Sequence, residues 1–240
     1  MSIKTNEIPV GVIGLGLMGC SITTCLLMAG HPVVAIAPIS IDMTTAESRI
    51  RKHFVKAKEE GLVNEDPEFY FKNLIITEDY GALKPCKLAI ECTLESEDIK
   101  KVVYGKIEAV IAEDALMTSN TSAIPISILQ KMTKHPDRFF GLHWAEPSHT
   151  TRFLEVICGD QSDIEKGEYL YELSNYWNKE ATLVRKDIRG FIGNRLMYAM
   201  YREAFYLVEN GYATVEDVDR ACRNNTGYWM TLVGVFGWMD

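Results

Sequence analysis

Short apolar runs alternate with amphipathic stretches up to about Asp187. Apolar runs of about four to eight residues bounded by turn residues are typical of strands buried on both faces, as in a parallel sheet. We expect strands at Ile8–Ile13, Val33–Ala37, Leu74–Thr77, Leu88–Thr93, Leu116–Ser119, Phe139–Trp144, Phe153–Cys158 and Thr182–Val184. Helices are expected at Cys20–Ala29, Met43–Gly61, Ile99–Ala112, Ile126–Met132 and Ile164–Trp177. This alternation predicts an α/β fold with a doubly wound, mostly parallel sheet.

One connection breaks the alternation. Residues 145–152, between Trp144 and Phe153, are too few for the crossover that joins two parallel strands. The two flanking runs should therefore form an antiparallel pair. His143 and Glu155 are equidistant from the midpoint of that hairpin, so we expect them opposite one another, with Cβ atoms about 4.5–5.5 Å apart.

The pattern changes after about Asp187, where only helical periodicity remains. Gly190–Asn210 predicts one long helix, and Val215–Cys222 a second one capped by Thr214. We therefore expect one domain over residues 1–187 and a smaller all-helical domain from residue 188 to 240. The chain reaches Asp240 within an apolar stretch that has no helix stop signal, which predicts a truncated helical domain.

Composition narrows the classes of protein. The chain has 240 residues, 47% of them hydrophobic, and a net charge of −8; it is long enough to bury a core, and its composition excludes general disorder. An acidic balance argues against nucleic-acid or anionic-membrane binding as the main task. We found neither an apolar run of membrane-spanning length nor a secretion signal. The six cysteines form no CxxC pair, which predicts reduced thiols, no metal site and a cytoplasmic protein.

A glycine motif follows the first expected strand. Gly14–Gly19 has the sequence GLGLMG and matches G-x-G-x-x-G at the point where a strand gives way to a helix. Gly14 would permit a tight turn, Gly16 the approach of a pyrophosphate, and Gly19 close packing of helix on strand. The N-terminus of the helix that follows the motif, with Leu17 and Met18 inside the motif, would offer N–H groups to the phosphates. The alternative is a glycine-rich turn in an unrelated α/β fold.

The second strand lacks the acidic residue that normally holds the adenosine ribose. Ala37 and Pro38 stand at its end, and no Arg beside them indicates a 2′-phosphate. Asp42 is a candidate to reach back from the following loop. The sequence therefore predicts a dinucleotide and leaves NAD and NADP both open.

Polar residues at the expected strand ends are candidates for chemistry. A carboxylate at Glu155 would fix the tautomer of His143 and raise its basicity, which suits a general base; the alternative is a solvent-facing pair. Ser119–Ser122, with the sequence SNTS, follows a strand at the edge where ligands bind, or caps a helix. Glu91 either faces the cofactor ribose or is solvated, and Glu95 is expected to be solvated.

Several motifs together resemble one family. The signatures are GLGLMG with a following AGH (Ala29–His31), SNTS, DRFFGLHWAEP (Asp137–Pro147), FLEVI (Phe153–Ile157) and GFIGNRL (Gly190–Leu196). In this order and spacing they resemble the 3-hydroxyacyl-CoA dehydrogenase family, from Val10 to about Asp219.

The resemblance implies a Rossmann-like fold and oxidation of an L-3-hydroxyacyl-CoA to the 3-keto form, with hydride passing to NAD. It implies that His143 takes the hydroxyl proton and that Glu155 orients and stabilises the imidazolium. Ser122 and Asn194 would hydrogen-bond the 3-oxygen or the thioester carbonyl of the substrate. The cofactor-binding residues implied are Gly14, Gly16, Leu17, Met18, Gly19, Glu91 and Asn120. A homodimer built through the helical domain is also implied.

Departures from the family pattern keep other substrates open. Besides Ala37, a carboxylate at Glu146 replaces the usual amide, Arg189 replaces a proline, and Gly227–Leu232 lacks the usual Gly-Pro. NADP is not excluded, because the ribose-binding acid is missing. These departures leave room for a dehydrogenase of a free 3-hydroxy acid, like the related carnitine and gulonate dehydrogenases.

A free acid would need a cationic anchor, for which Arg152, Arg189 and Arg195 are candidates. A non-catalytic relative, comparable to the lens crystallins of this family, is a third alternative. The joint presence of Ser122, His143, Glu155 and Asn194 argues against it, because a structural protein has no reason to keep all four.

Overall fold

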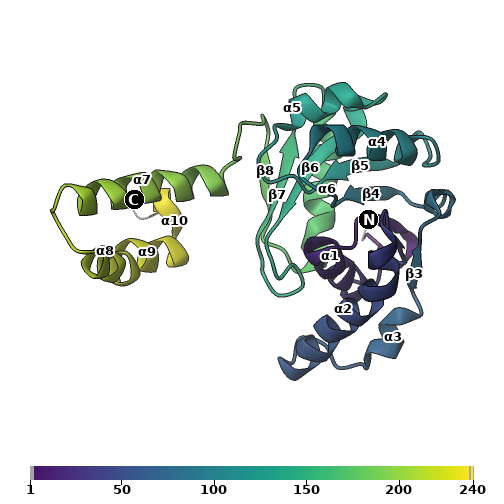
Figure 1. The fold of residues 1–240 in the computed structure, drawn as a ribbon, viewed down its shortest axis with the longest axis horizontal. Coiled ribbons are helices and arrows are strands. Elements are labelled where there is room, and N and C mark those ends of the chain that lie inside the picture. Colours follow the sequence, from purple (N-terminus) through teal and green to yellow (C-terminus); the bar gives the residue numbers. More distant parts are fainter. Residues whose placement is uncertain (1–2, 238, 240) are drawn as a thin grey trace. The chain divides into compact units, whose positions relative to one another are not determined.

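Eight strands form a single sheet in the order β3-β2-β1-β4-β5-β6-β7-β8 (Figure 1). The computed structural model describes residues 3–237 and 239. The strands are β1 (Val10–Ile13), β2 (Val33–Ile36), β3 (Leu74–Thr77), β4 (Leu88–Glu91), β5 (Leu116–Ser119), β6 (Phe139–Trp144), β7 (Leu154–Cys158) and β8 (Thr182–Val184). Neighbouring strands are parallel except for β6 and β7. The predicted α/β fold with a doubly wound, mostly parallel sheet is confirmed.

Helices cover both faces of this sheet. The apolar side chains of α1 (Leu17–Met28), α2 (Ser40–Glu59) and α6 (Ile164–Ser174) share one buried cluster with one face of the strands. Those of α4 (Glu97–Glu108) and α5 (Ile126–Leu129) share a second cluster with the opposite face. Strands β1, β2, β4 and β5 are buried along their whole length, which explains their unbroken apolar runs.

Short helical segments complete this part of the chain. They are α3 (Pro67–Phe71) and the 3₁₀ turns Thr5–Glu7, Tyr80–Leu83, Gln130–Met132, Pro136–Arg138 and Asn175–Trp177. The α3 helix was not expected from the sequence. Its five residues are too few to show helical periodicity.

The hairpin between β6 and β7 has the predicted register. His143 pairs directly with Glu155, and the strands pair from Phe140 with Cys158 to Trp144 with Leu154. The loop between them is symmetric about its midpoint, as the sequence predicted. This register places the imidazole and the carboxylate on the same face of the sheet.

The chain divides into two compact units, Met1–Phe191 and Ile192–Asp240. The second is all-helical, as expected: α7 (Gly193–Glu209), α8 (Val215–Ala221), a π-helical turn (Cys222–Thr226), α9 (Gly227–Leu232) and α10 (Gly234–Gly237). Thr214 caps α8 through a hydrogen bond from the Asp217 amide, as predicted. The long helix begins later than Gly190, because Gly190 and Phe191 have positive φ angles of 80° and 50°, which an α-helix cannot continue.

In the described part of the chain, no helix is both long and apolar enough to cross a membrane. All six cysteines are free thiols, as predicted: Cys20, Cys25, Cys86 and Cys158 are buried, and Cys92 and Cys222 are partly exposed.

Candidate active site

The glycine turn between β1 and α1 has the geometry that a dinucleotide needs. Gly14 has a φ of 99°, and a Cβ there would lie 2.7 Å from the carbonyl oxygen of Cys92. A Cβ on Gly19 would lie 1.8 Å from the Gly14 oxygen, so only glycine lets α1 pack this closely on the turn. Gly16, which caps α1, faces open space. The turn therefore fits a pyrophosphate at the N-terminus of α1, next to Leu17 and Met18.

Arg49 on α2 anchors this turn, and sequence reasoning missed it. Its Nη1 donates to the carbonyl oxygen of Leu15 at 2.8 Å and to Asp42 Oδ1 at 3.2 Å. Asp42, considered above as a ribose ligand, is instead only 6% exposed and paired with Arg49. No local periodicity in the sequence indicates a contact between α2 and the turn.

Glu91 at the end of β4 is fully buried, and its carboxylate is surrounded by partners within the chain. Lys100 Nζ donates to both of its oxygens, at 3.0 and 2.9 Å. Ser119 Oγ donates at 2.6 Å and Tyr104 Oη at 3.2 Å. Burial and the charge of Glu91 raise the pKa of Tyr104 well above its ordinary value. Through these hydrogen bonds Glu91 links the end of β4 to α4 and to the end of β5, and its charge is paired with that of the buried Lys100.

Glu95 accepts hydrogen bonds from the loop after β5. The expectation that its side chain is only solvated is therefore wrong. Its Oε1 accepts hydrogen bonds from Thr121 Oγ1 at 2.6 Å and from the amides of Ser122 and Ala123 at 3.1 and 3.2 Å. Its other oxygen lies 3.4 Å from Lys100 Nζ. Burial raises the pKa of Glu95, but these hydrogen bonds and the Lys100 charge outweigh it, so the pKa is lowered.

Asn120 connects two strand ends beside the histidine. Its backbone N–H donates to the Glu91 carbonyl oxygen at 2.8 Å, and its side-chain Oδ1 accepts a hydrogen bond from the backbone N–H of Trp144 at 3.0 Å. It therefore ties the end of β5 to that of β6, next to His143. Ser122 follows in the same loop and is exposed.

The structure brings His143 and Glu155 together as a buried pair. His143 Nδ1 lies 2.8 Å from Glu155 Oε2, and the two residues are 7% and 1% exposed. The rings of Phe153 and Phe191 each lie 5.5 Å from the imidazole. A carboxylate at this distance accepts a hydrogen bond from Nδ1–H, which keeps the ring proton on Nδ1 and leaves the lone pair of Nε2 for a substrate. The solvent-facing alternative is wrong.

The loop after His143 is fastened to α1. The Ser148 amide donates to Ser21 Oγ at 2.7 Å, and Ser21 Oγ lies 3.3 Å from His149 Nδ1. His53 of α2 stacks on His149 with ring centroids 4.8 Å apart. Burial, together with the charges of His53 and nearby lysines, lowers the pKa of His149 to about 4. This contact between loop and helices was not foreseen.

Asn194 and Arg195 belong to the second unit, in the first turn of α7. Their part in the site remains a prediction. Arg152 lies in the hairpin loop, with its Nε 3.7 Å from Glu180 Oε2, and both side chains are exposed.

A doubly wound sheet, a glycine turn at a helix N-terminus and a buried histidine–carboxylate pair together define a dinucleotide-dependent oxidoreductase. Residues 9–188 match the 3-hydroxyacyl-CoA dehydrogenase NAD-binding domain, and residues 190–240 match the C-terminal domain of the same family. The chain therefore belongs to the 3-hydroxyacyl-CoA dehydrogenase family. It is an NAD-dependent oxidoreductase.

Relatives of known name cover most of the chain. It is 32% identical to the 5-formyl-3-hydroxy-2-methylpyridine 4-carboxylate 5-dehydrogenase of Mesorhizobium japonicum, over 96% of this chain and 74% of that protein. It is also 32% identical to a 3-hydroxybutyryl-CoA dehydrogenase of Mycobacterium tuberculosis, over 88% of this chain and 75% of that protein. The crystal structure of an enzyme named for the same pyridine carboxylic acid, described as an NAD⁺-dependent dismutase, matches with a TM-score of 0.86 at 31% identity, over 97% of this chain and 75% of that chain.

Proposed function

We propose that this protein interconverts an L-3-hydroxyacyl-CoA and the 3-ketoacyl-CoA, with His143 as the general base. The observation that carries the proposal is the buried contact of 2.8 Å between His143 Nδ1 and Glu155 Oε2. This pair lies on β6 and β7, beside the carboxyl ends of the parallel strands, where this fold binds its ligands.

The proposed role of each residue follows from its surroundings. Glu155 accepts a hydrogen bond from Nδ1–H and so holds the tautomer in which the Nε2 lone pair takes the proton of the substrate hydroxyl. NAD, when bound, would supply the acceptor for the hydride that leaves the carbon bearing this hydroxyl. The imidazolium that forms is stabilised by the Glu155 carboxylate, in a site lined by the rings of Phe153 and Phe191.

Other residues position the two ligands in this proposal. Ser122, in the loop held by Glu95, and Asn194 hydrogen-bond the 3-oxygen or the thioester carbonyl. The turn from Gly14 to Gly19 binds the pyrophosphate, and Asn120 lies along the cofactor. Glu91 is also expected along the cofactor. Its carboxylate already accepts hydrogen bonds from Lys100 and from neighbouring side chains, so we assign it the role of holding the strand ends that contact the cofactor.

A free carboxylic acid is a second candidate substrate. It is favoured by the similarity over 96% of the chain to a dehydrogenase named for a pyridine carboxylate rather than a thioester. Arg152 would be its anchor in the first unit, since its exposed ion pair with Glu180, at 3.7 Å, is weak and readily exchanged.

Consumption of NADH, followed by absorbance, tests both candidates, with acetoacetyl-CoA and then dehydrocarnitine as oxidant. We expect turnover of acetoacetyl-CoA, which His143→Asn lowers by about 100-fold or more because the general base is lost. His135→Asn is the matched control, since His135 is an exposed histidine ahead of β6. NADH binding without turnover of acetoacetyl-CoA would exclude the acyl-CoA proposal, and turnover of dehydrocarnitine alone would establish the free acid.

We also propose a homodimer formed through the helical unit. None of the described residues of α7 to α10 is buried. On α7, Tyr198, Tyr201 and Phe205 are 56%, 48% and 65% exposed. Aromatic side chains gathered on one helix are typical of a surface that another protein surface covers.

A further inference from the structure

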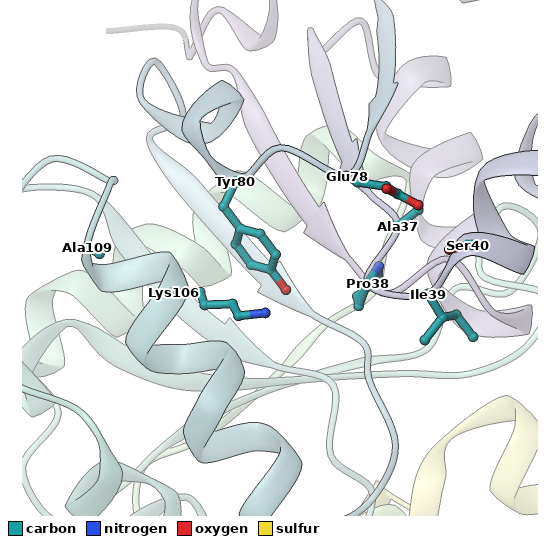
Figure 2. Close-up of a pocket in the computed structure, with 8 residues that line it drawn as sticks. All are labelled: Ala37, Pro38, Ile39, Ser40, Glu78, Tyr80, Lys106 and Ala109. Carbon is teal, nitrogen blue, oxygen red and sulfur yellow. The ribbon is translucent and has the colours of Figure 1, made fainter.

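A pocket of about 460 Å³ lies at the carboxyl end of β2, outside the histidine site. Its wall contains residues 37–40, which lead from β2 into α2, together with Glu78, Tyr80 and Lys106 (Figure 2). Lys106 Nζ lies 5.2 Å from the centre of the Tyr80 ring, which places a cation and an aromatic face on the same wall. The pocket is large enough for part of a nucleotide.

This pocket lies at the strand end where a doubly wound fold is expected to bind the adenosine half of a dinucleotide. In a doubly wound fold the pyrophosphate lies at the first glycine turn, and the adenosine ribose at the end of the second strand. Here β2 ends at Ile36, and Ala37 is 1% exposed and brings only a methyl group. Asp42, the nearest acid along the chain, is buried and paired with Arg49. The strand that normally supplies the ribose-binding acid therefore supplies none.

The neighbouring strand places a carboxylate beside the gap. Strands β2 and β3 are parallel, with Ile36 opposite Thr77, and the Ala37 amide donates to the Thr77 carbonyl oxygen at 2.9 Å. Glu78, the next residue, is exposed and lies beside Ala37 in Figure 2. Of the eight residues drawn there, Glu78 is the one with a carboxylate.

We propose that Glu78 binds the hydroxyls of the adenosine ribose and excludes a 2′-phosphate, so that β3 supplies the acid that β2 lacks. The proposal rests on the use of NAD by this family. A carboxylate accepts hydrogen bonds from vicinal hydroxyls, and its charge opposes a phosphate at the 2′ position. Lys106, which lines the pocket with Tyr80, would attract the 2′-phosphate of NADP. The repulsion of that phosphate by Glu78 must therefore exceed the attraction by Lys106.

Direct binding of cofactor fragments tests this assignment without any turnover. Isothermal titration with ADP-ribose and with 2′-phospho-ADP-ribose isolates the adenosine end, because neither compound carries nicotinamide. We expect the unaltered protein to bind ADP-ribose at least tenfold more tightly than 2′-phospho-ADP-ribose. Glu78→Gln should weaken ADP-ribose binding about tenfold, the loss expected for a hydrogen bond to a charged group, and bring the two affinities together. Glu65→Gln, which alters an exposed acid outside the pocket, should change neither affinity.

Each outcome decides the matter. An unchanged affinity ratio in Glu78→Gln, or tighter binding of the 2′-phosphate by the unaltered protein, would overturn the role of Glu78. Turnover with NADH would still stand in that case, so the two failures are distinguishable. If the unaltered protein binds neither fragment, both the role of Glu78 and the cofactor site fail.

Discussion

The chemistry at His143 depends on which ring nitrogen carries the proton. Glu155 can only accept a hydrogen bond from Nδ1, whereas an amide at this position can also donate one. Glu155→Gln therefore permits the tautomer with its proton on Nε2, which cannot accept the substrate proton. We expect kcat to fall by about 100-fold or more while the Kd of NADH stays unchanged.

Initial rates with acetoacetyl-CoA and fluorescence titration with NADH measure these two quantities. Glu165→Gln is the matched control, because Glu165 is exposed in the first turn of α6. An unchanged kcat in Glu155→Gln would mean that the carboxylate does not set the tautomer.

At the scale of single residues, the sequence predicts some side-chain contacts and misses others. The pairing of His143 with Glu155 followed from loop length and strand period, both of which are local signals. Lys100 and Arg49 were missed, although each binds a functional segment. Both are charged residues on helices, where the default expectation is a solvated side chain. Lys100 is 1% exposed and the Arg49 side chain 41% exposed, and the contact of each forms only when its helix packs against the sheet edge or the glycine turn.

At the scale of elements, the hairpin loop that follows His143 is held on α1 and α2 by histidine contacts. Its His149 has a pKa of about 4, lowered by burial and by the charges of His53, Lys179 and Lys56. Between the ordinary pKa of about 6.5 and this value, the unfolded chain binds a proton that the folded chain does not. Stability is therefore highest above about pH 6.5 and falls toward pH 4, by about 3 kcal/mol at this site.

His149→Gln should remove that part of the pH dependence. Urea unfolding at pH 7 and at pH 4.5 gives the free energy of unfolding of each variant, and the difference between the variants isolates His149. His135→Gln, at an exposed histidine, should keep the full pH dependence. Equal losses of stability in His149→Gln and the unaltered protein would show that His149 is protonated in the folded state.

Elements differ in how well the sequence predicts them. The buried parallel strands were found because both faces are covered, so each is an unbroken apolar run. The predicted start of α7 is too early. Phe191 fits the apolar periodicity of the helix, but its backbone has a positive φ of 50°, in the left-handed region. This strained backbone occurs at a residue that is fully buried against His143. Periodicity along the chain does not record such a conformation or the contacts of the residue that adopts it.

At the scale of the whole molecule, the two units differ in how their apolar surface is covered. The first unit has a buried cluster on each face of its sheet. In the second, Phe205 on α7 remains 65% exposed. The first unit is therefore expected to fold and bind NADH whatever the assembly state, because the glycine turn lies wholly within it.

The proposed dimer should separate when a charge is placed on α7. Sedimentation should give the unaltered protein about twice the chain mass of 27.1 kDa, and Phe205→Glu a mass nearer that of one chain. Burying an unpaired carboxylate at an aromatic contact costs about 2 kcal/mol or more, which weakens the dimer more than tenfold. Val102→Glu, on a 61% exposed apolar residue of α4, is the matched control and should remain dimeric. NADH binding should persist in both variants, so a monomeric Phe205→Glu that still binds NADH separates assembly from folding, whereas a monomeric unaltered protein contradicts the dimer.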